Sequence, residues 1–125
     1  MSYVVSNAER RRQYFWQTLD GLIGCMQAQP VIAYHHDPDA SPRLKWGPMT
    51  AHYKADVTNA VRKALPRQEL QKTFWKLAVR RAYGLTSPEQ FQDKLTGTVI
   101  SRCAKVFIER RLAPRTYFTE RRAAA

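Results

Sequence analysis

At 125 residues the chain has the length of one domain with a hydrophobic core, and its 44% content of hydrophobic residues excludes an intrinsically disordered chain. Its 21 Lys and Arg residues outnumber 10 Asp and Glu residues, for a formal net charge of +11. No apolar run approaches the length of a membrane span, and the first residues, MSYVVSNAERRR, lack the pattern of a secretory signal. We therefore expect a cytoplasmic protein with an anionic partner, of which nucleic acid is the leading candidate.

The first helix is expected to begin at a capping box, residues 6–9 (SNAE), and to end at about Gln27. Its apolar face carries Phe15, Trp16, Leu19, Leu22, Ile23 and Met26. Arg10, Arg11 and Arg12 lie in its first turns, where cations oppose the helix dipole. A bound anion would explain this unfavourable position, and the alternative is a set of solvated arginines.

A long irregular loop is expected at about residues 29–47, since prolines occur at 30, 38 and 42 and no helical period is present. Near its end, basic and aromatic residues alternate at Arg43, Lys45 and Trp46. Such a pattern is typical of nucleic-acid binding, in which the two cations hold phosphate and the indole ring stacks on a base. Packing of Trp46 over the core is the alternative.

The same loop contains the only cluster of metal-ligand residue types, namely His35, His36, Asp37 and Asp39. Adjacent histidines in an extended segment point to opposite sides, and Asp-Pro-Asp is typical of a turn, so we expect no metal and no cofactor. No metalloprotease, zinc-finger or phosphate-loop motif occurs. Cys25 and Cys103 have no base patterned beside them and are expected to be free buried thiols, which favours a non-catalytic protein.

The second helix is expected to open at Gly47-Pro48 and to end before Pro66. Its narrow stripe of mostly small apolar residues consists of Met49, Tyr53, Val57, Ala60, Val61 and Ala64. The next helix, from Pro66 to Gly84, is expected to be central, with Gly84 as its C′ residue. This expectation rests on a broad apolar arc of Leu70, Phe74, Trp75, Leu77, Ala78, Val79 and Ala82.

On the remaining strip of that helix lie Lys72, Lys76 and Arg80, with only Glu69 nearby to neutralise them. Residues four apart stand roughly 6 Å apart along a helix axis, close to the phosphate spacing of an extended nucleic-acid strand. The strip is therefore our first candidate for phosphate contacts. An ordinary solvated helix face is the alternative.

After Gly84 the chain restarts at residues 86–89, and the apolar pattern changes phase beyond Leu95. We favour two short helices with a break at Thr96-Gly97, and one long buried helix is the alternative. Residues 119–125 are expected to form an irregular C-terminal tail after a single helical domain at residues 1–118. The predicted fold is thus all-α, a compact bundle of four to five helices with one long loop and an irregular tail.

The second half of the chain resembles the promoter-reading helix-turn-helix domain at the C-terminus of bacterial sigma factors. The likeness rests on Leu65-Pro66, Phe74, Gly84-Leu85-Thr86, Glu89, Leu95, Gly97-Thr98-Val99, Ser101-Arg102 and Arg111-Leu112. The chain departs from that pattern in a shorter turn and in an extra residue between Thr86 and Glu89. The resemblance implies that Thr98, Ser101, Arg102 and Lys105 enter the major groove.

Our leading hypothesis is a non-catalytic protein that holds the phosphate backbone of RNA or DNA and works as a small subunit of a larger nucleoprotein complex. In size and character the chain is similar to the small helical subunits that line the strand in CRISPR surveillance complexes. Sequence-specific DNA binding and a protein-interaction module that docks on acidic partners are the alternatives. The expected phosphate contacts are Lys72, Lys76, Arg80, Arg10, Arg11, Arg12, Arg43, Lys45, Arg102 and Lys105, with Trp46 stacking on a base.

Overall fold

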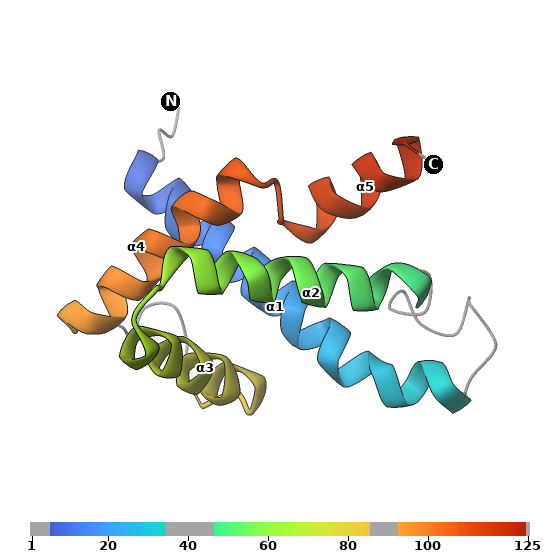
Figure 1. Cartoon of the computed structure of the whole chain (residues 1–125), viewed down its shortest axis with the longest axis horizontal. Helices are drawn as coiled ribbons and strands as arrows, with labels where there is room; N and C mark the ends of the chain where they lie inside the picture. Colours follow the sequence, from blue (N-terminus) through green and yellow to red (C-terminus); the bar gives the residue numbers. More distant parts are fainter. Residues whose placement is uncertain (1–5, 35–46, 86–92, 125) are drawn as a thin grey trace, which may run out of the picture.

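The computed structural model describes residues 6–34, 47–85 and 93–124, which form five α-helices and no strand. The helices are α1 (Asn7–Tyr34), α2 (Gly47–Ala64), α3 (Gln68–Ala82), α4 (Lys94–Glu109) and α5 (Pro114–Ala124). In Figure 1, α2 crosses α1 in the middle of the molecule, while α3 and α5 lie toward opposite ends of the view. The predicted all-α bundle is confirmed.

The core lies where α1, α2 and α4 meet, since these three helices make the most extensive contacts with one another. Phe15 of α1 is at its centre. The Phe15 ring stacks on Phe107 at 6.0 Å and meets Phe74 and Trp16 edge-on at 6.2 and 5.2 Å. Aromatic pairs at such distances contribute about 0.5–1.5 kcal/mol each beyond burial, so Phe15 ties α1 to both α3 and α4.

Helix α1 begins as expected, because Ser6 Oγ accepts a hydrogen bond from the Glu9 amide at 3.1 Å. Its end was wrongly placed at Gln27, since the helix continues to Tyr34. Pro30 removes one intrahelical hydrogen bond, but the residues on both sides of it keep helical geometry. The first part of the loop expected at residues 29–47 is therefore helical, and residues 35–46 lie outside the described chain.

Helices α1, α2 and α5 approach one another closely at Gly21, which is buried. A Cβ atom at Gly21 would overlap the ring of Pro114 and lie 2.9 Å from Tyr53 Oη. The Tyr53 hydroxyl donates to the Leu112 carbonyl at 2.6 Å and also lies 3.3 Å from the Thr18 carbonyl. A small residue in α1 thus lets one buried hydroxyl connect α2 with the turn between α4 and α5.

Helix α3 is peripheral and not central as expected. It packs on α1 and α4 through one face, on which Leu70, Phe74, Leu77 and Ala78 are buried. Trp75 is half-buried, while Val79 and Ala82 at the edges of the apolar arc are exposed. The central helix is α1, which contacts all four other helices. The expected stripe of α2 is buried at Tyr53, Val57, Ala60 and Val61. The central position was predicted from the width of the apolar arc. The residues at the edges of this arc are apolar, but no other helix covers them.

Gly84 follows α3 as its C′ residue, as its sequence indicates, with φ +69°. The Gly84 amide donates to Arg81 O at 3.0 Å and the Leu85 amide to Arg80 O at 2.9 Å, which is a Schellman motif. Helix α4 ends in the same motif, but there Arg111 takes the left-handed position with φ +55°. The tight turn before α3 is also confirmed, since α2 ends at Ala64 and α3 begins at Gln68.

Residues 94–109 form one helix, so the predicted break at Thr96-Gly97 is wrong. The alternative of one long helix through the whole segment is not fulfilled either, because the helix begins at Lys94, directly after the extended residue Asp93. Asp93 caps this helix by accepting from the Thr96 amide at 2.9 Å, and Gly97 bonds back to Asp93 O at 3.0 Å. The apolar pattern changes phase because Leu95 is exposed and does not belong to the buried face. Residues 86–92, including the expected restart, lie outside the described chain.

The C-terminal segment is also more regular than expected, because α5 continues to Ala124. The tail predicted to be irregular from Thr119 is therefore helical. Pro114 suits the first turn of a helix, and Tyr117 and Phe118 are buried against the core. Tyr117 Oη donates to Asp56 Oδ2 at 2.7 Å, which fixes α5 on α2.

Candidate nucleic-acid interface

Lys72, Lys76 and Arg80 form a row of exposed cations along α3, which we call the cation row. Their four-residue spacing places them roughly 6 Å apart along the axis. Within the described residues, none of the three has a carboxylate partner. Their positive charge therefore faces solvent and is not neutralised by an ion pair with these residues.

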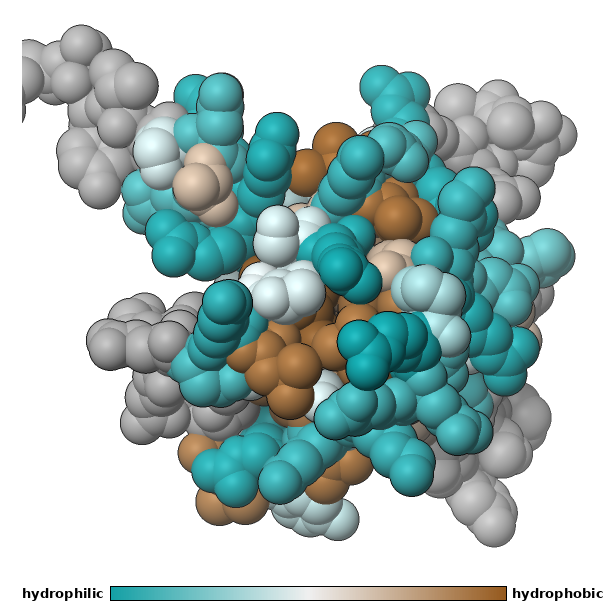
Figure 2. All heavy atoms as spheres, turned by 60° about the vertical axis from the view of Figure 1, so that its left-hand side comes forward, coloured by the Kyte–Doolittle hydropathy of each residue, from teal (hydrophilic) through white to brown (hydrophobic). Residues whose placement is uncertain are grey.

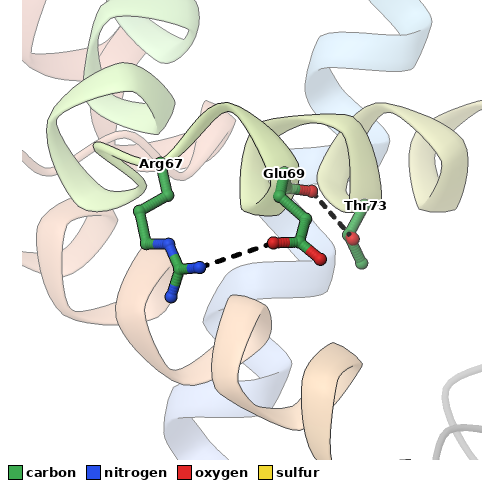
Figure 3. A network of polar contacts seen from close by, with 3 residues as sticks. All are labelled: Arg67, Glu69 and Thr73. Carbon is green, nitrogen blue, oxygen red and sulfur yellow. Dashed lines mark hydrogen bonds and ion pairs between the residues drawn. The ribbon is translucent and has the colours of Figure 1, made fainter.

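The one acidic residue of α3, Glu69, is engaged away from the cation row (Figure 3). Its carboxylate lies 3.5 Å from the Arg67 guanidinium, and its backbone carbonyl accepts from Thr73 Oγ1 at 3.1 Å. Both Arg67 and Glu69 are well exposed, so this ion pair contributes little to stability. The pair does, however, direct the acid toward the start of the helix.

Arg81, the residue after the last member of the cation row, does have a carboxylate partner. Its Nε and terminal nitrogen donate to the two carboxylate oxygens of Asp20 at 3.0 and 3.1 Å. Its guanidinium also lies 5.4 Å from the Trp16 ring centroid, in cation–π geometry. The fold thus uses Arg81 to join α3 to α1 and leaves Arg80 directed outward.

The arginines at the start of α1 are exposed, as expected. Arg11 and Arg12 line an open groove of about 240 Å³ between α1 and α4, together with the Trp16 ring. The α4 wall of this groove consists of Gly97, Ile100, Ser101 and Ala104. Small residues on that wall leave space in front of two cations and one hydroxyl, a combination suited to a phosphate oxygen.

A second open groove, of about 330 Å³, lies between α3 and the start of α4. Lys76 and Arg80 line it on the α3 side, and Asp93, Leu95 and Thr96 line it on the α4 side. Hydrogen bonds from the Thr96 side chain and amide lower the pKa of Asp93. Asp93 is thus an ionised helix cap that partly offsets the field of the two cations.

The two grooves place the cations of α1 and of α3 on either side of the first half of α4. Figure 2 brings the α3 and α4 side of the molecule forward and shows hydrophobic surface in the middle of the face, with hydrophilic side chains around it. Arg102 and Lys105 are exposed on α4, so eight of the ten predicted phosphate contacts are exposed on three helices.

The turn implied by the sigma-factor resemblance is not present, because α4 runs without interruption from Lys94 through Leu95 and Thr98. Thr98 Oγ1 donates to Lys94 O at 2.9 Å inside its own helix, so its hydroxyl is engaged there. Ser101, Arg102 and Lys105 are exposed on this one continuous helix.

The remaining predicted contacts, Arg43, Lys45 and Trp46, lie outside the described residues, as do the four metal-ligand residue types of residues 35–39. His52 is exposed on α2. In residues 6–34, 47–85 and 93–124, no three potential metal ligands lie together.

Cys25 and Cys103 are free and buried, as the sequence indicates. Burial raises the pKa of Cys25 to about 11 and that of Cys103 to about 12. Both thiols are therefore protonated at neutral pH and poor nucleophiles.

Sequence reasoning missed an apolar groove of about 350 Å³ between α1 and α3. It is lined by Ile23, Met26, Trp75, Ala78, Val79, Ala82 and Tyr83. One signal was present in the sequence, because Trp75, Val79 and Tyr83 repeat every four residues beside the cation row. The α1 wall could not be inferred without the packing of the two helices.

No protein-family model, curated protein or solved structure matches this chain. Among the helices of the described residues, none combines the length and the apolar character needed to cross a membrane.

Proposed function

We propose that this protein binds the phosphate backbone of a nucleic acid without catalysing a reaction, as a small subunit of a cytoplasmic nucleoprotein complex. The observation that supports this proposal most strongly is the cation row, which lacks carboxylate partners within the described residues. Arg81, the arginine of the same helix that joins α3 to α1, does have such a partner in Asp20.

Binding would combine three groups of cations on a rigid helical framework. The cation row supplies regularly spaced charges, while Arg11 and Arg12 add guanidinium groups that can hold phosphate through two hydrogen bonds. Arg102 and Lys105 extend the positive surface along α4. Because these contacts are to the backbone and not to base edges, we expect little dependence on nucleotide sequence.

The proposal is tested by fluorescence anisotropy with labelled single-stranded and duplex oligonucleotides of several sequences. Each phosphate contact contributes about 0.7–0.9 to the slope of log affinity against log salt, so six or more contacts give a steep decline between ~50 and ~200 mM salt. Lys76→Ala should weaken binding to all sequences alike. Affinities that hardly change over this salt range would contradict the proposal.

Arg115→Ala is the matched control for Lys76→Ala. Arg115 is also an exposed cation, but it lies on α5 and not on α3. Both variants lose one positive charge, so a general charge effect would weaken binding equally. We expect a clearly larger loss for Lys76→Ala, and equal losses would show that the cation row has no special role.

A further inference from the structure

A row of less polar side chains runs beside the cation row on α3. Trp75, Val79 and Tyr83 each follow a member of the cation row by three residues, and residues three apart are neighbours on a helix surface. The relative exposure is 55% for Val79 and 77% for Tyr83. Their shared four-residue spacing joins these side chains into one surface beside the cation row.

This row forms the α3 wall of the apolar groove, and Ile23 and Met26 of α1 contribute to the opposite wall. Met26 is 43% exposed. Trp75 is held edge-to-face against Phe74 at 5.0 Å, so its indole is a fixed wall, whereas the Tyr83 ring stands at the open end of α3. The groove volume of about 350 Å³ falls within the range of small-molecule sites.

We propose that this groove receives bases of a single-stranded nucleic acid whose phosphates lie along the cation row. The inference rests on the proposed function and narrows it to strands with unstacked bases. Aromatic rings next to backbone-binding cations are the usual means of holding single strands, because every base has a flat apolar face. In a duplex the bases are stacked inside and cannot enter the groove.

Charge complementarity favours a single strand over a second copy of the chain. An occupant that extends from the groove to the adjacent cation row would meet apolar surface at Val79 and Tyr83 and positive charge beside it, and a single strand carries flat apolar bases and negative charge along one chain. A symmetric contact between two copies would use the same surface twice and bring two cation rows together. With a net charge of +11 on each copy, this contact is disfavoured.

The test compares an oligothymidine strand with an abasic strand of the same length, which retains every phosphate and lacks every base. By fluorescence anisotropy we expect the protein to bind the base-carrying strand about 5- to 150-fold more tightly, the range of one base–aromatic stack. Tyr83→Ala should remove most of this preference, and Tyr83→Phe should retain it because the ring remains. Lys76→Ala should weaken binding of both strands.

Three outcomes separate this inference from the proposed function. Equal, salt-sensitive affinity for both strands would overturn the base-binding groove and leave phosphate binding intact. Absence of salt-sensitive binding to either strand would overturn both. A dimer seen by sedimentation that dissociates with Val79→Glu would assign the groove to a second copy and overturn the inference.

Discussion

Replacing Tyr53 with phenylalanine removes one oxygen atom from the place where α2 meets α1 and the α4–α5 turn. Tyr53 is fully buried, and its ring meets Tyr117 edge-on at 4.9 Å and lies 5.2 Å from Phe118. Phenylalanine keeps these ring contacts. The change therefore removes only the hydrogen bonds of the hydroxyl, to the Leu112 carbonyl at 2.6 Å and to the Thr18 carbonyl at 3.3 Å.

The expected loss of stability at pH 7 is about 1–3 kcal/mol, because the nearly inaccessible Leu112 carbonyl loses its donor. Stability should also respond to pH. Burial raises the pKa of Tyr53 well above its usual value, so above pH ~10 only the unfolded chain releases this proton. Wild-type stability therefore falls as the pH rises past ~10, and the phenylalanine variant lacks this contribution. The difference between the two proteins should shrink at high pH.

Urea unfolding followed by tryptophan fluorescence measures both effects, at pH 7 and above pH ~10. Tyr14→Phe is the matched control, since Tyr14 accepts from the Ala113 amide at 3.2 Å but is only half-buried. Water can replace part of that bond, so its loss should be smaller. A Tyr53→Phe variant as stable as wild type at pH 7 would refute this account of the core.

Gly84→Ala should destabilise the protein by about 1–2 kcal/mol, because Gly84 has φ +69° with open space around its Cβ position, so the cost is backbone strain; an unchanged Tm would contradict this. Thr18→Val should raise the free energy of unfolding by about 1 kcal/mol, since the buried Thr18 Oγ1 has no hydrogen-bond partner among the described residues. A less stable variant would show that the hydroxyl is satisfied. The pKa values of Cys25 and Cys103 are raised to about 11 and 12. At pH 7 both thiols should therefore react with a thiol reagent only as fast as the protein opens. Rapid labelling of the native protein would contradict this expectation.

The elements that the sequence predicted correctly depend on local backbone chemistry. Ser6 caps α1, Pro66 separates α2 from α3, and Gly84 closes α3, each through bonds or restrictions within a few residues of itself. The errors arose where packing between helices decides. Leu95 belongs to α4 but does not lie on its buried face, and Pro30 lies within α1. Neither position can be predicted from the neighbouring residues.

In the candidate interface, too, the features with a local pattern were predicted and those that depend on packing between helices were not. The cation row has a helical period and was predicted, whereas the role of Arg81 depends on Asp20 in another helix. Nothing in the residues around Arg81 distinguishes it from Arg80. The apolar groove needs the α1 wall of Ile23 and Met26, which only the packing of α1 on α3 supplies.

If the cation row, and not net charge alone, holds a nucleic-acid backbone, its removal should change the salt dependence of binding. The most direct measurement is the slope of log affinity against log salt for a variant in which all three members of the row are alanine. With about 0.7 per single-strand phosphate, the slope should become shallower by about 2. A control with Arg62, Lys63 and Arg115 changed to alanine loses the same charge from other exposed positions and should keep nearly the wild-type slope. Equal slopes for the two variants would contradict the claim.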